Sequence, residues 1–149
     1  MPRGKKRRLS ISLKRDEALT ATRVSIGTEK LVYVLVADKK LTYLGGKSRI
    51  AYIGTTRKGV ARIARSVAVR AYDILSLPGV RTFRARVITC QPRQRVRTWH
   101  KLERALLIAF KDRFGEVPTC NSHGTRMRET DEFDYFRRAR VNSILSDLS

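Results

Sequence analysis

The chain has 149 residues and carries 33 Lys and Arg against 13 Asp and Glu, which gives a formal net charge of +20. This length predicts one domain and excludes a multidomain protein, while 42% hydrophobic residues exclude wholesale disorder. The longest apolar run, residues 31–37, is too short to span a bilayer, so we expect neither a membrane partner nor a secretory signal. The excess of positive charge predicts a polyanionic partner, most commonly nucleic acid.

Residues 1–28 differ from the rest of the chain in their charge. We interpret them as a mobile basic arm that contacts phosphate, the alternative being a leader that only improves solubility. Seven positive side chains precede the first acid, Asp16, and these are Arg3, Lys5, Lys6, Arg7, Arg8, Lys14 and Arg15.

The next segments predict two strands, a helix and a third strand. Residues 31–36 are apolar on both alternating sets, which indicates a strand buried on two faces. Residues 38–48 resemble a long hairpin connection, with 41–44 as a possible short strand inside it, and 50–55 form the second strand. Apolar residues at helical spacing predict a helix over 57–75. In residues 80–90, Arg84 and Arg86 alternate with apolar side chains, which predicts a third strand with one basic face.

The remaining segments predict two more helices. The first covers residues 94–114 and is closed by Gly115, and a loop over 116–124 follows it. Residues 131–148 predict a C-terminal helix with acids in its first turn. The expected fold class is therefore α/β, a small three-stranded, mainly antiparallel sheet flanked by helices in the order β-β-α-β-α plus the C-terminal helix. We divide the chain into the arm (1–28), a central domain (29–124) and a helical extension that packs on the domain (125–149).

The two cysteines, Cys90 and Cys120, are too far apart for a CxxC metal or redox motif. We expect both to be reduced thiols, which are typical of an intracellular protein in the cytoplasm or nucleoid.

Glu103 is the most informative polar residue in the predicted helices. It shares one helix face with Trp99, Leu106 and Phe110, and a carboxylate on an apolar face is unfavourable unless it is paired or binds a cation. An internal salt bridge with an arginine is one explanation. Metal ligation or acid–base chemistry is the other.

Two further groups have both a structural and a functional interpretation. Lys58, Arg62 and Arg65 fall on one stripe of the first predicted helix, which is either a solvated face or a surface that follows a phosphate backbone. Tyr33 and Tyr52 lie on the two strands joined by the hairpin, where tyrosines usually pack across strands, although the pairing also allows both hydroxyls to share one surface.

These residues together resemble the GIY-YIG nuclease family over about residues 31–122. The chain has Leu31-Val32-Tyr33 at the first motif, with Leu31 and Val32 in place of the usual glycine and isoleucine, and an intact second motif, Tyr52-Ile53-Gly54. The other positions that match, in order along the chain, are Arg62, Glu103 and Asn121.

The resemblance implies a metal-dependent DNA endonuclease that hydrolyses phosphodiester bonds with one divalent ion. Glu103 would hold Mg²⁺ or Mn²⁺, and Arg62 would clamp the scissile phosphate. Tyr52 would deprotonate or orient the attacking water, Tyr33 would position that water or the phosphate, and Asn121 would fix the geometry by hydrogen bonding.

Other polar residues complete the predicted site. We expect His100 either to orient Glu103 or carry a proton, or to be a partly buried histidine with a satisfied hydrogen bond. The partner would be double-stranded or branched DNA, with no small-molecule cofactor, and the protein would be a monomer or a homodimer. The alternative function is a non-catalytic basic protein that binds nucleic acid, for example a ribosome-associated or regulatory one. The residues expected to contact nucleic acid are Arg57, Lys58, Arg65, Arg84 and Arg86.

Overall fold

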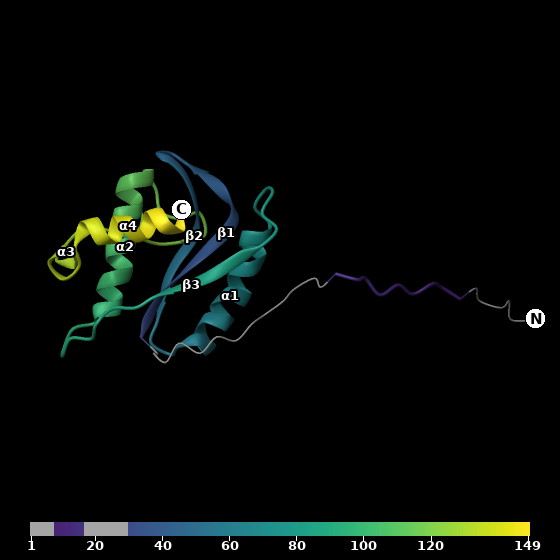
Figure 1. Cartoon of the computed structure of the whole chain (residues 1–149), viewed down its shortest axis with the longest axis horizontal. Helices are drawn as coiled ribbons and strands as arrows, with labels where there is room; N and C mark the ends of the chain where they lie inside the picture. The colour runs from purple at the N-terminus through teal and green to yellow at the C-terminus, as the bar shows by residue number, and fades with distance from the viewer. Residues whose placement is uncertain (1–7, 17–29) are drawn as a thin grey trace, which may run out of the picture.

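The computed structural model describes residues 8–16 and 30–149, and it has a three-stranded antiparallel sheet with helices on both faces (Figure 1). The predicted α/β class is confirmed at this level. Most of the basic arm predicted over 1–28 lies outside the described residues. The elements are β1 (Leu31–Tyr43), β2 (Gly46–Thr56), α1 (Val60–Leu75), β3 (Phe83–Ile88), α2 (Thr98–Phe114), α3 (Glu132–Tyr135) and α4 (Arg138–Leu148).

β1 is the central strand, and it pairs antiparallel with β2 on one side and β3 on the other. Its first five residues, 31–35, are all buried, which confirms the prediction of a strand covered on two faces. Helix α1 covers one face of the sheet and α2 the other (Figure 1). The hydrophobic core therefore forms two layers, one on each side of β1.

The long hairpin connection predicted over residues 38–48 is wrong. β1 continues to Tyr43 and β2 starts at Gly46, so that only Leu44 and Gly45 make the turn. The register shifts between Val36 and Leu41, and this irregularity leaves the polar residues 38–40 exposed without ending the strand. Beyond it, the buried Tyr43 donates a hydrogen bond to the Ile50 carbonyl (2.6 Å), which holds the two strands together.

The tip of this hairpin is attached to the end of α2. The Gly45 amide donates a hydrogen bond to the Phe114 carbonyl (2.9 Å), and the Leu44 amide donates one to the Glu116 carboxylate (3.2 Å). Gly115, with φ of 76°, ends α2 in the left-handed conformation that glycine adopts readily, as predicted. The hairpin tip and the C-terminal end of α2 thus form one connected unit.

Both main helices start later than predicted. Helix α1 begins at Val60 rather than 57, because Gly59 has a φ of 70°, which is not helical. The Gly59 carbonyl accepts the first hydrogen bonds of the helix, from the amides of Arg62 and Ile63. Lys58 therefore lies in the turn before α1 and not on a stripe of the helix. Helix α2 begins at Thr98 rather than 94, and residues 93–96 form a separate turn closed by a bridge between Arg93 and Val96.

The C-terminal helix predicted over residues 131–148 is broken into α3 and α4. Phe136 has an extended backbone (φ −126°, ψ 132°), and its half-buried side chain packs against the core, so the chain turns there. α4 packs against α2 through Val141, Leu145 and Leu148, all of which are buried. In the described residues, no helix is long and apolar enough to cross a membrane.

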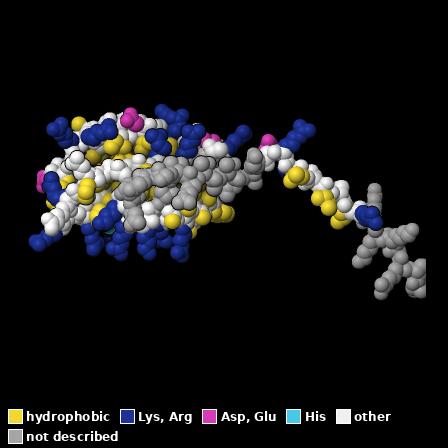
Figure 2. Space-filling model, turned by 60° about the horizontal axis from the view of Figure 1, so that its bottom comes forward, with side chains coloured by type: hydrophobic (Ala, Val, Ile, Leu, Met, Phe, Trp, Pro, Cys, Tyr) yellow, Lys and Arg dark blue, Asp and Glu magenta, His cyan; other side chains and the backbone are white. Residues whose placement is uncertain are grey.

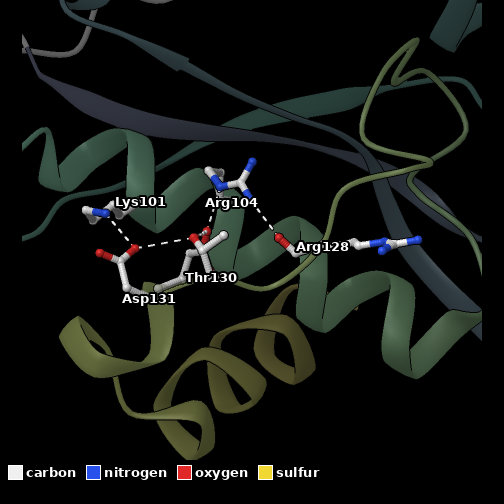
Figure 3. A network of polar contacts seen from close by, with 6 residues as sticks. Lys101, Arg104, Arg128, Thr130 and Asp131 are labelled. Carbon is white, nitrogen blue, oxygen red and sulfur yellow. Dashed lines mark hydrogen bonds and ion pairs between the residues drawn. The ribbon is translucent and has the colours of Figure 1, made fainter.

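A buried acid anchors α3 to α2. Glu132 is fully buried and accepts a hydrogen bond from Arg104 Nε (2.6 Å) and another from the Thr130 amide (2.7 Å). Arg104 also donates to the Arg128 carbonyl, and Lys101 pairs with Asp131 (2.6 Å) beside it (Figure 3). Although burial opposes ionisation, the hydrogen bonds from Arg104 and Thr130 outweigh it and lower the pKa of Glu132 to about 2.

Candidate active site

Tyr33 and Tyr52 lie next to each other on the face of the sheet that α1 covers. Their ring centroids are 5.8 Å apart, and both side chains are buried. Gly54 pairs with Tyr33 across the strands, and a Cβ atom at Gly54 would lie 2.6 Å from Cε1 of Tyr52 and 2.8 Å from the hydroxyl oxygen of Tyr33. The glycine of the Tyr52-Ile53-Gly54 motif is therefore required for the two rings to pack.

Helix α1 holds this tyrosine pair through two side chains at a spacing of four residues. The hydroxyls of Tyr33 and Ser66 form a hydrogen bond (2.5 Å), and the Arg70 guanidinium stacks over the Tyr52 ring, 4.6 Å from its centroid. Burial raises the pKa of Tyr33 to about 12, although the hydrogen bond from Ser66 opposes it. Tyr33 therefore keeps its proton at neutral pH. Arg62 is one turn before Ser66 on the same side of α1.

A basic pocket of about 520 Å³ opens where β2 ends and where α1 and α2 begin. The exposed Arg57, Lys58 and Arg62 line it from the α1 side. At its base the Lys58 amide donates to the Thr56 hydroxyl (3.0 Å), which fixes the turn before α1. The residues that line the pocket are Thr55, Thr56, Arg57, Lys58, Arg62, Arg97, Trp99 and His100. Four of these eight side chains are Lys or Arg and none is acidic, so the pocket is suited to an anion.

Glu103 is half-buried on α2, one turn further along the helix than Trp99 and His100. Phe110 packs edge-on against Tyr43 of β1, with 5.1 Å between the ring centroids. Glu103 is seven residues before Phe110, two helical turns away, so it lies on the stripe of α2 that faces the sheet. Burial raises the pKa of Glu103 to about 7, and Arg104 offsets this only in part. Within residues 8–16 and 30–149, the structure gives Glu103 no ion pair or hydrogen bond, so the predicted alternative of an internal salt bridge has no support there.

The environment of Glu103 fits one hydrated divalent ion. In the described part of the chain, every fully buried side-chain nitrogen or oxygen has a hydrogen-bond partner. Because the Glu103 carboxylate has no hydrogen-bond partner among these residues, its oxygens are not fully buried and still reach solvent. No cluster of three or more His, Cys, Asp or Glu suited to a metal occurs among the described residues. Mg²⁺ keeps several water ligands and is often bound through only one or two carboxylates, so Glu103 alone is compatible with it.

Asn121 binds the outer edge of β2. Its side-chain oxygen accepts from the Ile53 amide (3.0 Å), and its side-chain nitrogen donates to the Ile53 carbonyl (2.9 Å). The neighbouring Cys120 amide donates to the Ala51 carbonyl, and the Cys120 carbonyl accepts from Arg70. The loop that carries Asn121 thus fixes the strand of the second motif and, through Arg70, the ring of Tyr52.

The structure distributes the predicted residues over three places rather than one. Tyr33 and Tyr52 meet beneath α1, whereas Arg62 lies in the basic pocket and Glu103 is on the helix that covers the other face. Asn121 joins the tyrosine strand from its edge.

The other predicted contact residues are also divided. His100 is exposed in the pocket, whereas a partly buried position was one of the two expectations. The described residues show no hydrogen bond between His100 and Glu103. Arg65 is exposed on α1 outside the pocket lining. Arg84 and Arg86 are exposed on β3, and Arg86 borders a different groove. Cys90 and Cys120 are both free thiols, as predicted.

Ser66 and Arg70 were not predicted from the sequence as part of this region, and Trp99 was expected to pack in the core, whereas Arg97 belongs to a run of arginines (93, 95 and 97) expected to contact a phosphate backbone. Ser66 and Arg70 hold the tyrosine pair, and their spacing of four and eight residues from Arg62 was the available signal. Arg97 and Trp99 line the pocket, and Lys30 Nζ lies 4.8 Å from the centroid of the Trp99 ring. Nothing local in the sequence joins Arg97 to Arg57, because only the fold brings the starts of the two helices together.

Comparison of the chain with protein-family models, with curated proteins and with solved structures finds no match. The resemblance to GIY-YIG nucleases therefore stays a prediction from the residues.

Proposed function

We propose that this chain binds nucleic acid and hydrolyses phosphodiester bonds with the help of one divalent metal ion. The observation that supports this most is the basic pocket, in which Arg57, Lys58 and Arg62 from the start of α1 face Arg97 and His100 from the start of α2. Glu103, the only half-buried acid that the sequence places on the apolar stripe of α2, follows one turn later.

Nucleic acid is the anion that best fits the whole surface. The net charge is +20, and Figure 2 shows Lys and Arg side chains along the margins of the molecule with few acids between them. Such a surface binds a phosphate backbone without reading its sequence. In the proposed complex Arg62 donates two hydrogen bonds to the scissile phosphate, and Arg57 and Lys58 hold the neighbouring phosphates.

A divalent ion held by Glu103 would supply stabilisation of the negative charge on the phosphoryl and leaving oxygens. Metal binding requires the ionised carboxylate, and the pKa of Glu103 is raised to about 7. Binding of Mg²⁺ should therefore strengthen between pH 6 and pH 8.

The tyrosine pair has a supporting role in this proposal. Because the pKa of Tyr33 is about 12, Tyr33 acts only as a hydrogen-bond donor or a packing group and not as a base. We assign Tyr52 a packing role, because its ring is fixed by Tyr33 and Arg70 beneath α1, on the face of the sheet opposite the helix that carries Glu103.

The test is nicking of supercoiled plasmid by the purified protein in Mg²⁺, in Mn²⁺ and in EDTA. Arg62→Ala and Glu103→Gln should each lower the rate about 10²-fold or more while plasmid binding persists, because each removes charge stabilisation in the transition state. Lys47→Ala and Glu129→Gln, which change an exposed basic and an exposed acidic residue outside the pocket, should cut at the unchanged rate.

Cleavage that continues in EDTA or in Glu103→Gln would contradict the metal role. Absence of cleavage on plasmid, single-stranded and branched DNA, with binding intact, would favour the second candidate, a non-catalytic nucleic-acid-binding protein. That candidate is supported by the burial of both tyrosines, whose rings pack in the core beneath α1.

A further inference from the structure

The two edges of the sheet are covered differently. The outer edge of β2 is bound by the loop of Cys120 and Asn121, through the Ala51 carbonyl and both backbone groups of Ile53. The outer edge of β3 has no backbone partner among residues 8–16 and 30–149. An open edge is able to accept a further strand.

The pairing of β1 with β3 identifies the open backbone groups. Asp38 donates to the Thr82 carbonyl (3.0 Å), and this bonded pair continues the β1–β3 register in which Val36 is opposite Arg84. Bonded and non-bonded pairs alternate along an antiparallel ladder. The amides and carbonyls of Ala85 and Val87 therefore point away from β1, toward the open edge.

A groove of about 540 Å³ runs beside this edge, between β3 and the helices α3 and α4. Apolar and polar groups share its lining, and the charged residues among them are Arg86, Arg137, Arg140 and Asp147. The apolar side chains that line it are Val87, Ile88, Cys90, Leu102, Phe136, Val141, Ile144 and Leu148.

The described N-terminal segment has the pattern that such an edge and groove require. Leu9, Ile11 and Leu13 are 90%, 98% and 96% exposed, and they alternate with Ser10 and Ser12. In Figure 2, hydrophobic side chains form a row along this segment. Alternation with a period of two is typical of a strand with one buried face, and here that face is uncovered.

We propose that residues 9–13 add to the sheet of the same chain as a fourth strand on the open edge of β3. Leu9, Ile11 and Leu13 then enter the groove, and Ser10 and Ser12 face solvent. The new strand supplies hydrogen-bond partners for Ala85 and Val87, and main-chain pairing with alternate side chains in pockets is the recurring way in which an extended segment joins a sheet.

The connection is long enough for the chain's own segment to occupy the edge. Residues 14–30 join it to β1, and a connection of that length spans up to about 55 Å. The target is close to where that connection ends, because Val32, near the start of β1, pairs with Ile88, the last residue of β3. The six residues of β3 extend only about 20 Å. Tethering also raises the effective concentration of the segment to the millimolar range, which favours it over a second copy.

The experiment measures amide hydrogen exchange at Ala85 and Val87 in the full chain, in Ile11→Lys and in the matched control Ser12→Lys. We expect exchange at both amides to be at least tenfold slower in the full chain and in Ser12→Lys than in Ile11→Lys. The protection should not depend on protein concentration, and light scattering should give a monomer mass.

Three results would overturn the proposal. Exchange in the full chain as fast as in a chain without residues 1–15 would mean that the edge is open. Equal protection in Ile11→Lys would mean that another group covers it. Protection that rises with concentration, together with a dimer mass, would assign the edge to the segment of a second copy. Circular dichroism of each variant confirms that the central sheet is folded, since residue 11 lies outside it.

Discussion

Gly54 is the position at which a side chain as small as one methyl group should disturb the candidate site. A Cβ atom there would lie 2.6 Å from Cε1 of Tyr52 and 2.8 Å from Cζ of Tyr33, well inside ordinary contact distance. Gly54→Ala should therefore lower the free energy of unfolding by about 1–3 kcal/mol, because the rings must shift. Urea denaturation measures this.

A double-mutant cycle separates this clash from a general effect on β2. Tyr33→Phe removes the hydroxyl that crowds Gly54 and also the hydrogen bond to Ser66. The two changes should be non-additive, with Gly54→Ala less damaging in the Tyr33→Phe background. Additive effects would show that the hydroxyl does not cause the clash.

Glu132 is the second residue whose environment makes a sharp prediction. Its pKa, lowered to about 2, lies below the ordinary value of 4.5, so its stabilising contribution is complete above about pH 4.5 and is lost as the pH falls toward 2. Glu132→Gln should lower the free energy of unfolding by roughly 1–3 kcal/mol at pH 7, because the hydrogen bond from Arg104 loses its charged acceptor.

The measurement is urea denaturation at several pH values between 2 and 7. The difference between Glu132→Gln and the unaltered chain should shrink toward zero near pH 2. Glu129→Gln is the control, since its exposed ion pair with Arg138 should contribute about 0–1 kcal/mol. A pH-independent difference for Glu132→Gln would contradict the assigned pKa.

At the scale of residues, the sequence predicted which side chains are unusual better than it predicted the groups that surround them. The unusual position of Glu103 was visible from helical spacing alone, and the structure agrees that it is half-buried. The full burial of Glu132 was not visible, because acids in the first turn of a helix are normally explained by the helix dipole. Its partner Arg104 belongs to another helix, and no sequence period connects them.

At the scale of elements, the loop after α2 should contribute to the stability of β2. Asn121 makes two hydrogen bonds to Ile53, as a neighbouring strand would. Asn121→Ala leaves both backbone groups of Ile53 without these partners, so we expect a loss of about 1–3 kcal/mol in the free energy of unfolding. Thermal denaturation measures it, and Ser122→Ala is the exposed control. A loss no larger than that of the control would contradict the role of Asn121.

The order of strands and main helices could be predicted because hydrophobic spacing is a local signal. The errors arose where tertiary contacts override it. Residues 38–40 are polar and predicted a loop, but the paired strands continue past them to the buried Tyr43. Residues 131–148 have one helical period, but packing of Phe136 against the core interrupts it. The alternation of Leu9, Ile11 and Leu13 with serines did not predict a strand, because the sheet edge that could pair with it is known only from the fold.

At the scale of the whole molecule, charge should dominate binding. A chain of net charge +20 that binds DNA releases counterions, so the logarithm of its affinity should fall linearly with the logarithm of the salt concentration. Deleting residues 1–15, which contain seven of the eight Lys and Arg of the arm, should weaken binding and flatten that slope. Fluorescence anisotropy with labelled DNA at several salt concentrations measures it. An unchanged slope would mean that the arm does not contact phosphate.

The basic pocket could not be predicted at this scale. It is formed by the turn before α1 and the start of α2, whose lining residues Arg57 and Arg97 are distant in the sequence. Composition alone predicts that a phosphate backbone is bound, but it does not indicate where. Only the packing of two helices on opposite faces of one sheet brings their starting points to the same end.

The attachment of the hairpin tip to α2 has a consequence for how the protein opens. Because Gly45 and Leu44 bond to Phe114 and Glu116, fraying of the hairpin also requires release of the end of α2. The β1–β2 hairpin and α2 should therefore unfold as one cooperative unit. Helix α1 and strand β3 make fewer contacts with that unit, so the free energy of their local opening should be lower than that of global unfolding. The tyrosines would then be uncovered by a partial opening, without global unfolding.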